Sequence, residues 1–102
     1  MDANNGFRYA AEKLDAARRT LKRHPELDDD SIWSALHECW LGLREIRRDD
    51  LDALARSWLD GLDAIRGDDE LPAPEAISKL DRTERLELYR HVVNLAEWFE
   101  RA

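Results

Sequence analysis

The side chains best suited to catalysis or metal binding are three histidines, one cysteine and the many acidic residues. His37 precedes Glu38, as at the start of a zinc-protease helix, but Leu41 occupies the position where a second histidine would complete the metal face. No histidine follows a glutamate by three residues, as di-iron helical bundles require, and the four glycines form no phosphate-binding loop. The main interpretation is therefore a protein with no catalytic residues, no metal and no cofactor.

Arg85 is followed six positions later by His91. This spacing resembles the Arg-x4-6-His pattern of the HEPN ribonucleases, which are themselves helical bundles. The resemblance implies RNA cleavage in which Arg85 and His91 act together. Similar spacing also occurs at Arg18 and Arg19 before His24, and on one helix Arg85 and His91 lie about 120° apart. A HEPN-like ribonuclease using Arg85 and His91 is the alternative function in the enzyme class.

The elements that position these residues are predicted to be helices. The chain contains only two valines, two threonines and four isoleucines, whereas residues that favour helices are abundant. Apolar residues recur at helical spacing over residues 5–24, 31–47, 49–66 and 82–100, with a short helical turn over 74–80. Links this short favour antiparallel neighbours, so we expect an all-α, up-down four-helix bundle in one domain over residues 1–102.

Residues 31–66 contain three of the four tryptophans and should form the centre of the bundle. We expect a helical hairpin that bends at residues 47–50, with Trp40 beside Ser57 and Trp58. Gly42 and Gly61 lie inside these two helices at a cost of about 1 kcal/mol each relative to alanine. Glycines in such positions mark close contact between helices, or they are simply tolerated.

Net charge restricts the classes of partner. The chain carries a formal charge of −7, which disfavours nucleic acid as a ligand because phosphate binding depends on clustered lysine and arginine. Cys39 has no second cysteine to pair with, and no apolar run is long enough for a leader or a membrane span. We expect a cytoplasmic protein that binds no membrane and favours basic partner proteins.

Two groups of residues are candidates for partner binding. In an up-down bundle the first and third links lie at the same end, so their acidic residues should form one acidic cap. The cap comprises Glu26 and six candidate binding residues: Asp28, Asp29, Asp30, Asp68, Asp69 and Glu70. The second group is a flank of the second helix, where Trp33 and Trp40 lie one above the other with His37 and Arg44 close by. Whether this flank belongs to the core or to an interface stays open at this point.

The sequence favours a small acidic protein-binding factor, such as an inhibitor, an immunity or antitoxin-like protein, or an accessory subunit. A homodimeric scaffold that buries the tryptophan flank against its twin is an alternative. Mimicry of nucleic-acid charge is another, and it predicts binding that weakens steeply as salt rises.

Overall fold

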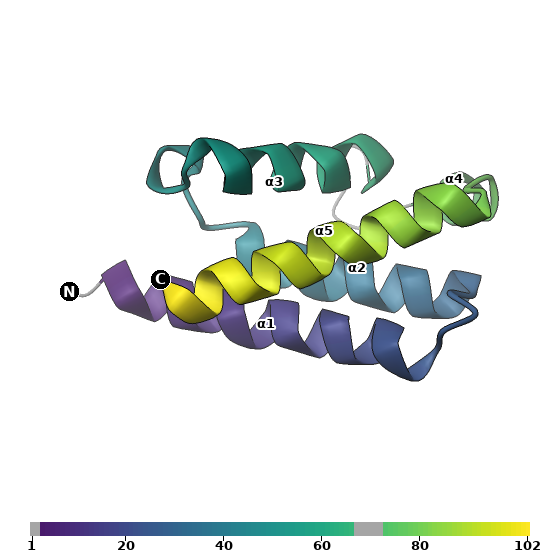
Figure 1. Ribbon diagram of the computed structural model, residues 1–102, viewed down its shortest axis with the longest axis horizontal. Helices are drawn as coiled ribbons and strands as arrows, with labels where there is room; N and C mark the ends of the chain where they lie inside the picture. The colour runs from purple at the N-terminus through teal and green to yellow at the C-terminus, as the bar shows by residue number, and fades with distance from the viewer. Residues whose placement is uncertain (1–2, 67–72) are drawn as a thin grey trace.

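The computed structural model describes residues 3–66 and 73–102, with side chains described for residues 6–65 and 73–102. Within these ranges the chain is all-α. Four long helices run alternately in opposite directions, and the first and last helices lie side by side (Figure 1). The predicted up-down arrangement is therefore confirmed. No helix in the described ranges combines the length and the apolar character needed to cross a membrane.

Helix α1 (Ala3–Arg23) packs against α2 (Asp29–Leu43) and α5 (Arg82–Arg101). The apolar residues that recur at helical spacing along this helix face the core: the side chains of Ala10, Leu14, Ala17 and Leu21 are fully buried, and that of Phe7 is partly buried. Gly42 of α2 lies so close to Ala10 that an added Cβ would be 3.3 Å from the Ala10 Cα. Small side chains therefore bring α1 and α2 together, as the sequence indicated.

Helix α2 begins two residues before the predicted start, since Asp28 occupies the N-cap position with extended backbone and Asp29 and Asp30 lie in the first turn. Carboxylates in this position offset the positive end of the helix dipole. The preceding link is tightly folded. Leu27 adopts a left-handed conformation (φ 52°) and its side chain is buried.

The link between α2 and α3 (Ala53–Arg66) is longer than the predicted bend. Helix α2 ends at Leu43 instead of residue 47, and a short 3-10 turn spans Arg48–Asp50. Leu51 is then buried at 3% exposure, and Asp52 caps α3 by accepting a 2.8 Å hydrogen bond from the Ala55 backbone N–H. The predicted bounds are therefore wrong here: α2 ends at Leu43 and not at residue 47, and α3 begins at Ala53 and not at residue 49, because the link places Leu51 in the core and Asp52 at the N-cap.

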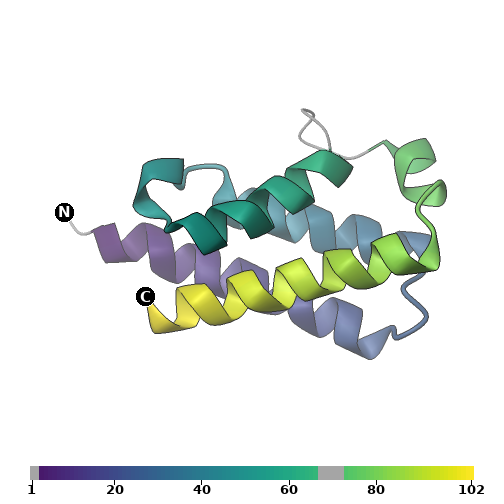
Figure 2. The same cartoon turned by 45° about the horizontal axis from the view of Figure 1, so that its top comes forward.

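Helix α4 (Pro74–Ser78) is a single short element with Pro74 in its first turn, at the end of the bundle that also holds the α1–α2 link (Figure 2). Its Ile77 is buried. Helix α5 then opens with the predicted capping box, in which Asp81 and Glu84 each accept a hydrogen bond from the other's backbone N–H. The predicted turn over 74–80 and the predicted helix over 82–100 are thus correct to within two residues.

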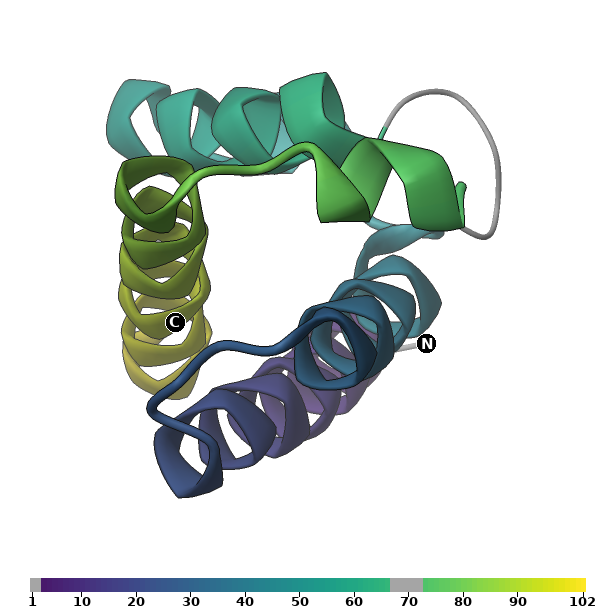
Figure 3. The ribbon, with the colours of Figure 1, turned by 90° about the vertical axis from the view of Figure 1, so that its right-hand side faces the viewer.

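Packing is uneven around the bundle. Close contact runs from α2 to α1, from α1 to α5 and from α5 to α3, whereas α2 and α3 approach one another much less closely. In the view from the end that carries α4, helices α1 and α2 lie together in the lower part, α5 lies at the left and α3 crosses the top, with α4 between α3 and α2 (Figure 3). The predicted hairpin is therefore correct in that α2 and α3 run in opposite directions, and wrong in that the two helices do not pack closely against each other.

Candidate functional site

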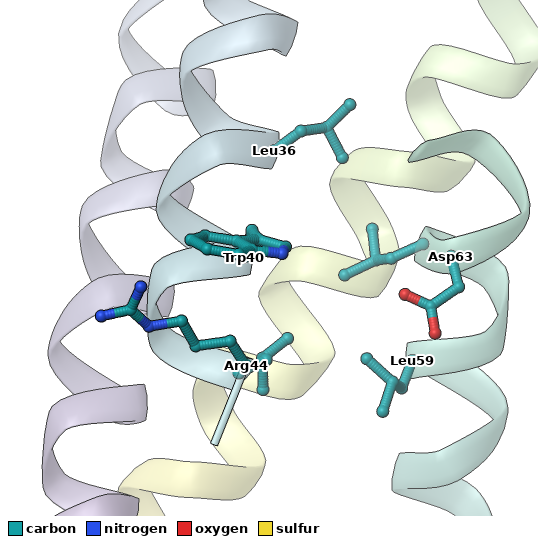
Figure 4. Close-up of a pocket in the computed structure, with 8 residues that line it drawn as sticks. Leu36, Trp40, Arg44, Leu59 and Asp63 are labelled. Atoms are coloured by element: carbon teal, nitrogen blue, oxygen red, sulfur yellow. The ribbon is translucent and has the colours of Figure 1, made fainter. Parts of the chain in front are cut away.

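The loosely packed side of the bundle contains a groove of about 360 Å³ between α2 and α3. Both walls are mainly apolar. The α2 wall consists of Leu36, Cys39, Trp40 and Leu43 together with Arg44, the C-cap residue that follows the helix, and the α3 wall consists of Leu59, Leu62 and Asp63. Figure 4 shows labelled side chains of both walls, with Leu59 and Asp63 extending from α3. Clefts between packed helices are common binding sites in bundles.

The edges of the groove carry charge. Directly after the end of α2, the Arg44 guanidinium carbon lies 5.0 Å from the centre of the Trp40 ring, in a cation–π contact that extends away from α3 (Figure 4). On α3 the Asp63 side chain is exposed beside Leu59. Ser57 and Trp58, which the hairpin prediction placed beside Trp40, do not line the groove. We call Trp40 with Arg44 the α2 lip, and Leu59 with Asp63 the α3 lip.

The predicted tryptophan flank is divided into two pairs. Trp33 and His37 stack at 5.3 Å, nearer the start of α2, and Trp33 packs against the core. Trp40 and Arg44 lie further along the helix, where Trp40 is partly exposed at the groove. Trp33 therefore packs against the core, and Trp40 lies partly exposed at the edge of the groove.

Three of the candidate binding residues in the acidic cap are described, and two of them form contacts within the fold. Asp28 accepts a 2.6 Å hydrogen bond from the Ser31 hydroxyl, which lowers the pKa of the Asp28 carboxyl. Asp29 pairs with Arg85 at 2.7 Å, whereas Asp30 is exposed and lines a shallow pocket beside Trp33. The remaining predicted members lie outside the described residues: Asp68, Asp69 and Glu70.

His24, Glu26 and Asp28 also lie at this end, and one ligand-type atom from each is within 4.8 Å of the others. The side chains of His24 and Glu26 are exposed. The backbone carbonyl of Glu26 also accepts a 3.2 Å hydrogen bond from the Arg82 guanidinium. Because a cation already lies against this link, we assign no metal to these residues.

Arg85 joins three elements at the same end of the bundle. Its guanidinium donates to the carbonyl oxygens of Leu80 at 3.1 Å, Leu27 at 2.7 Å and Ile77 at 2.9 Å. It also forms the ion pair with Asp29. The guanidinium is therefore engaged by the chain itself, as expected of an arginine that stabilises the fold.

His91, the other residue of the HEPN-like pattern, packs between α5 and α3. An added Cβ on Gly61 would lie 2.5 Å from the His91 Nε2 atom, so Gly61 leaves the space that the imidazole fills. The His91 Nδ1 atom is buried and has no hydrogen-bond partner within the described residues. Neither Arg85 nor His91 lines the groove between α2 and α3.

The stability of the protein should fall between pH 7 and pH 5 because of His91. Burial lowers the pKa of the imidazole from its ordinary value of 6.5; Glu87 opposes this shift and Arg90 adds to it. The unfolded chain therefore binds the proton at higher pH than the folded chain does. The stabilisation is complete above the unfolded pKa and is lost as pH falls through that value toward the lower, folded pKa.

Denaturation midpoints measured at pH 7.5 and pH 5.5 test this expectation. His91→Gln should reduce the difference between the two midpoints, while the matched change at the exposed His24, His24→Gln, should preserve it. An unchanged difference in the His91→Gln protein would contradict the assignment.

Sequence reasoning identified Trp40 and Arg44 but missed the facing wall, chiefly Leu59 and Asp63. A periodic apolar stripe on α3 was visible, but no pattern in one helix reports its distance from another. Neither a protein-family model, nor a curated protein, nor a solved structure matches this chain. The groove is therefore the feature of this protein from which a function can be inferred.

Proposed function

We propose that this protein is a non-catalytic, protein-binding factor and that the groove between α2 and α3 receives its partner. It acts as an inhibitor, an immunity or antitoxin-like protein, or an accessory subunit. The observation that carries the proposal is the accessible apolar groove, in a bundle whose other adjacent long helices pack closely. Burial of apolar surface is the main driving force for association between proteins.

The composition of the groove supports a protein as the ligand. Its walls offer leucines for apolar contact, while Trp40 and Arg44 belong to the residue types most enriched in binding hot spots. Trp40 does not belong to the buried core, so its ring can contact a partner without unfolding the bundle. The contacts of Arg85 and His91 support structural roles for both residues.

A polar substitution in either wall of the groove should weaken partner capture at least tenfold. Leu59→Glu places a carboxylate in the α3 wall, where binding a partner would have to desolvate it. Trp40→Gln removes the aromatic surface from the α2 wall. We expect both variants to lose at least tenfold in affinity for proteins that copurify with the wild-type chain from its native host, a factor that corresponds to about 1.4 kcal/mol.

Leu86→Glu is the matched control, because Leu86 is 41% exposed on α5 and does not line the groove. Circular dichroism and thermal denaturation establish that all three variants are folded. If Leu59→Glu and Trp40→Gln capture the same proteins as Leu86→Glu does, the groove is not the binding site.

A further inference from the structure

We propose that His91 acts as a pH-sensitive latch, which holds helix α3 against the bundle and releases it when the imidazole gains a proton, while α1, α2 and α5 stay packed. The latch is the contact between His91 of α5 and Gly61 of α3. Release of α3 is then a property of the chain itself, independent of any partner in the groove.

Helix α3 makes the least contact with the rest of the bundle among the four long helices. It lies on the opposite side of the molecule from α1 (Figure 1, Figure 3), and among the described helices it packs closely only against α5. Its contact with the short α4 is lighter, and α2 lies across the groove. Weakly packed elements open at lower free energy than the rest of a fold. Loosening of the α3–α5 contact therefore frees α3 before the other long helices.

The contact between α3 and α5 includes the ring of His91. An added Cβ on Gly61 would lie 2.5 Å from the Nε2 atom of the ring and 2.7 Å from its Cδ2 atom, so the edge of the imidazole lies directly on the α3 backbone. The Nδ1 atom is buried and has no hydrogen-bond partner in the described part of the chain. An imidazolium carries an N–H donor on both ring nitrogens. Protonation therefore places a charge and a donor without an acceptor in this contact, and movement of α3 lets water solvate both.

The surroundings of the ring give the direction of the pH effect. Burial is the main influence, and it lowers the pKa of His91; among the charged groups of α5, Glu87 favours the protonated ring and Arg90 disfavours it. A released ring regains its ordinary pKa, so it binds the proton at higher pH than the packed ring does. Acid therefore shifts the equilibrium toward the released form. The shift begins as pH falls through 6.5 and is complete below the lowered pKa of the packed ring.

The described side chains of α3 bring no opposite charge to the protonated ring. Residues one turn from Gly61 on the same face are uncharged: Ser57, Trp58, Ala64 and Ile65. The Asp60 carboxylate pairs with Arg48 at 2.6 Å, and Asp63 lines the groove that faces α2. Arg56 acts on the N-cap carboxylate of α3. The cost of the buried imidazolium is therefore not offset from the α3 side.

The start of α3 stays attached to the bundle at acidic pH. Leu51 is buried directly before this helix, and the Asp52 carboxylate accepts a 3.1 Å hydrogen bond from the Trp98 indole of α5. Hydrogen bonds from the Ala55 backbone N–H and from Trp98 lower the pKa of the Asp52 carboxyl, so this contact keeps its charge where His91 becomes protonated. Release therefore turns α3 about its first residues. Such a motion separates the α3 lip from the α2 lip and widens the groove.

Amide hydrogen exchange followed by NMR at pH 7.5 and pH 5.5 tests the latch, because it reports protection factors for each helix separately. In the wild-type protein, the protection of α3 amides relative to α1 amides should fall about fivefold or more at pH 5.5, the effect expected of a buried donor without an acceptor. His91→Gln cannot gain the proton and should show the same ratio at both pH values. The matched controls are the other two histidines, and His24→Gln and His37→Gln should keep the wild-type fall.

The wild-type measurement is decisive even where a variant does not fold. A fall of equal size in all four long helices would show that acid opens the whole bundle and would overturn the latch. An unchanged ratio would show that the packed site accepts the imidazolium, which also overturns it. A fall confined to α3 that persists in His91→Gln would assign the pH dependence to another group. None of these outcomes alters what the capture assay reports for Leu59→Glu, so the latch and the groove are tested separately.

Discussion

Replacing Arg85 by alanine should lower the free energy of unfolding by about 3 kcal/mol or more. The Arg85 side chain is only 13% exposed and ties the carbonyl groups of Leu27, Ile77 and Leu80, together with the Asp29 carboxylate, to the start of α5. Removing it leaves these acceptors without their donor in a partly buried site. Urea denaturation of the variant and the wild type measures the loss.

Arg90→Ala is the matched control, because Arg90 is exposed on the same helix and should tolerate alanine with little change. Arg85→Lys should recover only a small part of the loss, since an ammonium group cannot reproduce the planar fork that reaches several carbonyl groups at once. An Arg85→Ala protein as stable as Arg90→Ala would show that these contacts contribute little.

This result bears on the ribonuclease alternative. An activity lost in Arg85→Ala would have two explanations, a missing catalytic group or an unfolded bundle. Arg85→Lys keeps the positive charge but not the geometry, so activity and stability have to be measured on the same samples. Only a variant that stays folded and loses RNA cleavage would support a catalytic role for Arg85.

The helices were predictable wherever one signal dominated. On α1 the spacing of Ala10, Leu14, Ala17 and Leu21 left one face for the core, and the structure buries all four. At the start of α5, a capping acid and a glutamate three residues later specify a boundary through local hydrogen bonds alone. Such signals need no knowledge of the rest of the fold.

The α2–α3 link was not predictable because a distant contact overrides local preference there. Residues 44–47 and 49–52 were predicted to be helical, yet Leu51 is buried and Asp52 accepts a 3.1 Å hydrogen bond from the Trp98 indole of α5. The stabilising free energy of these contacts cannot be inferred from a short segment of sequence, because the residues in contact lie far apart along the chain. The same limit hid the groove, because the distance between α2 and α3 depends on how α1, α4 and α5 pack against them.

Replacing Gly42 by leucine should destabilise the bundle by about 3 kcal/mol, the upper part of the range for overpacking. A Cβ at this position would lie 2.7 Å from the Lys13 Cβ and 3.3 Å from the Ala10 Cα. Both atoms belong to the α1 backbone or lie directly on it, so they move only if the whole helix moves. Leucine favours helices more than glycine does, so any loss of stability comes from packing.

Two other glycines separate the clash from the change in helix propensity. Gly6→Leu is the control, because among the residues whose side chains are described an added Cβ there meets only the Ile46 side chain, at 3.8 Å, and its midpoint should stay level or rise. Gly61→Ala falls between the two, since its Cβ meets the movable ring of His91. Thermal midpoints should therefore fall most for Gly42→Leu, less for Gly61→Ala and not at all for Gly6→Leu. A Gly42→Leu protein as stable as Gly6→Leu would mean that α1 and α2 do not pack through Gly42. That outcome would contradict the close contact between α1 and α2 on which the bundle depends.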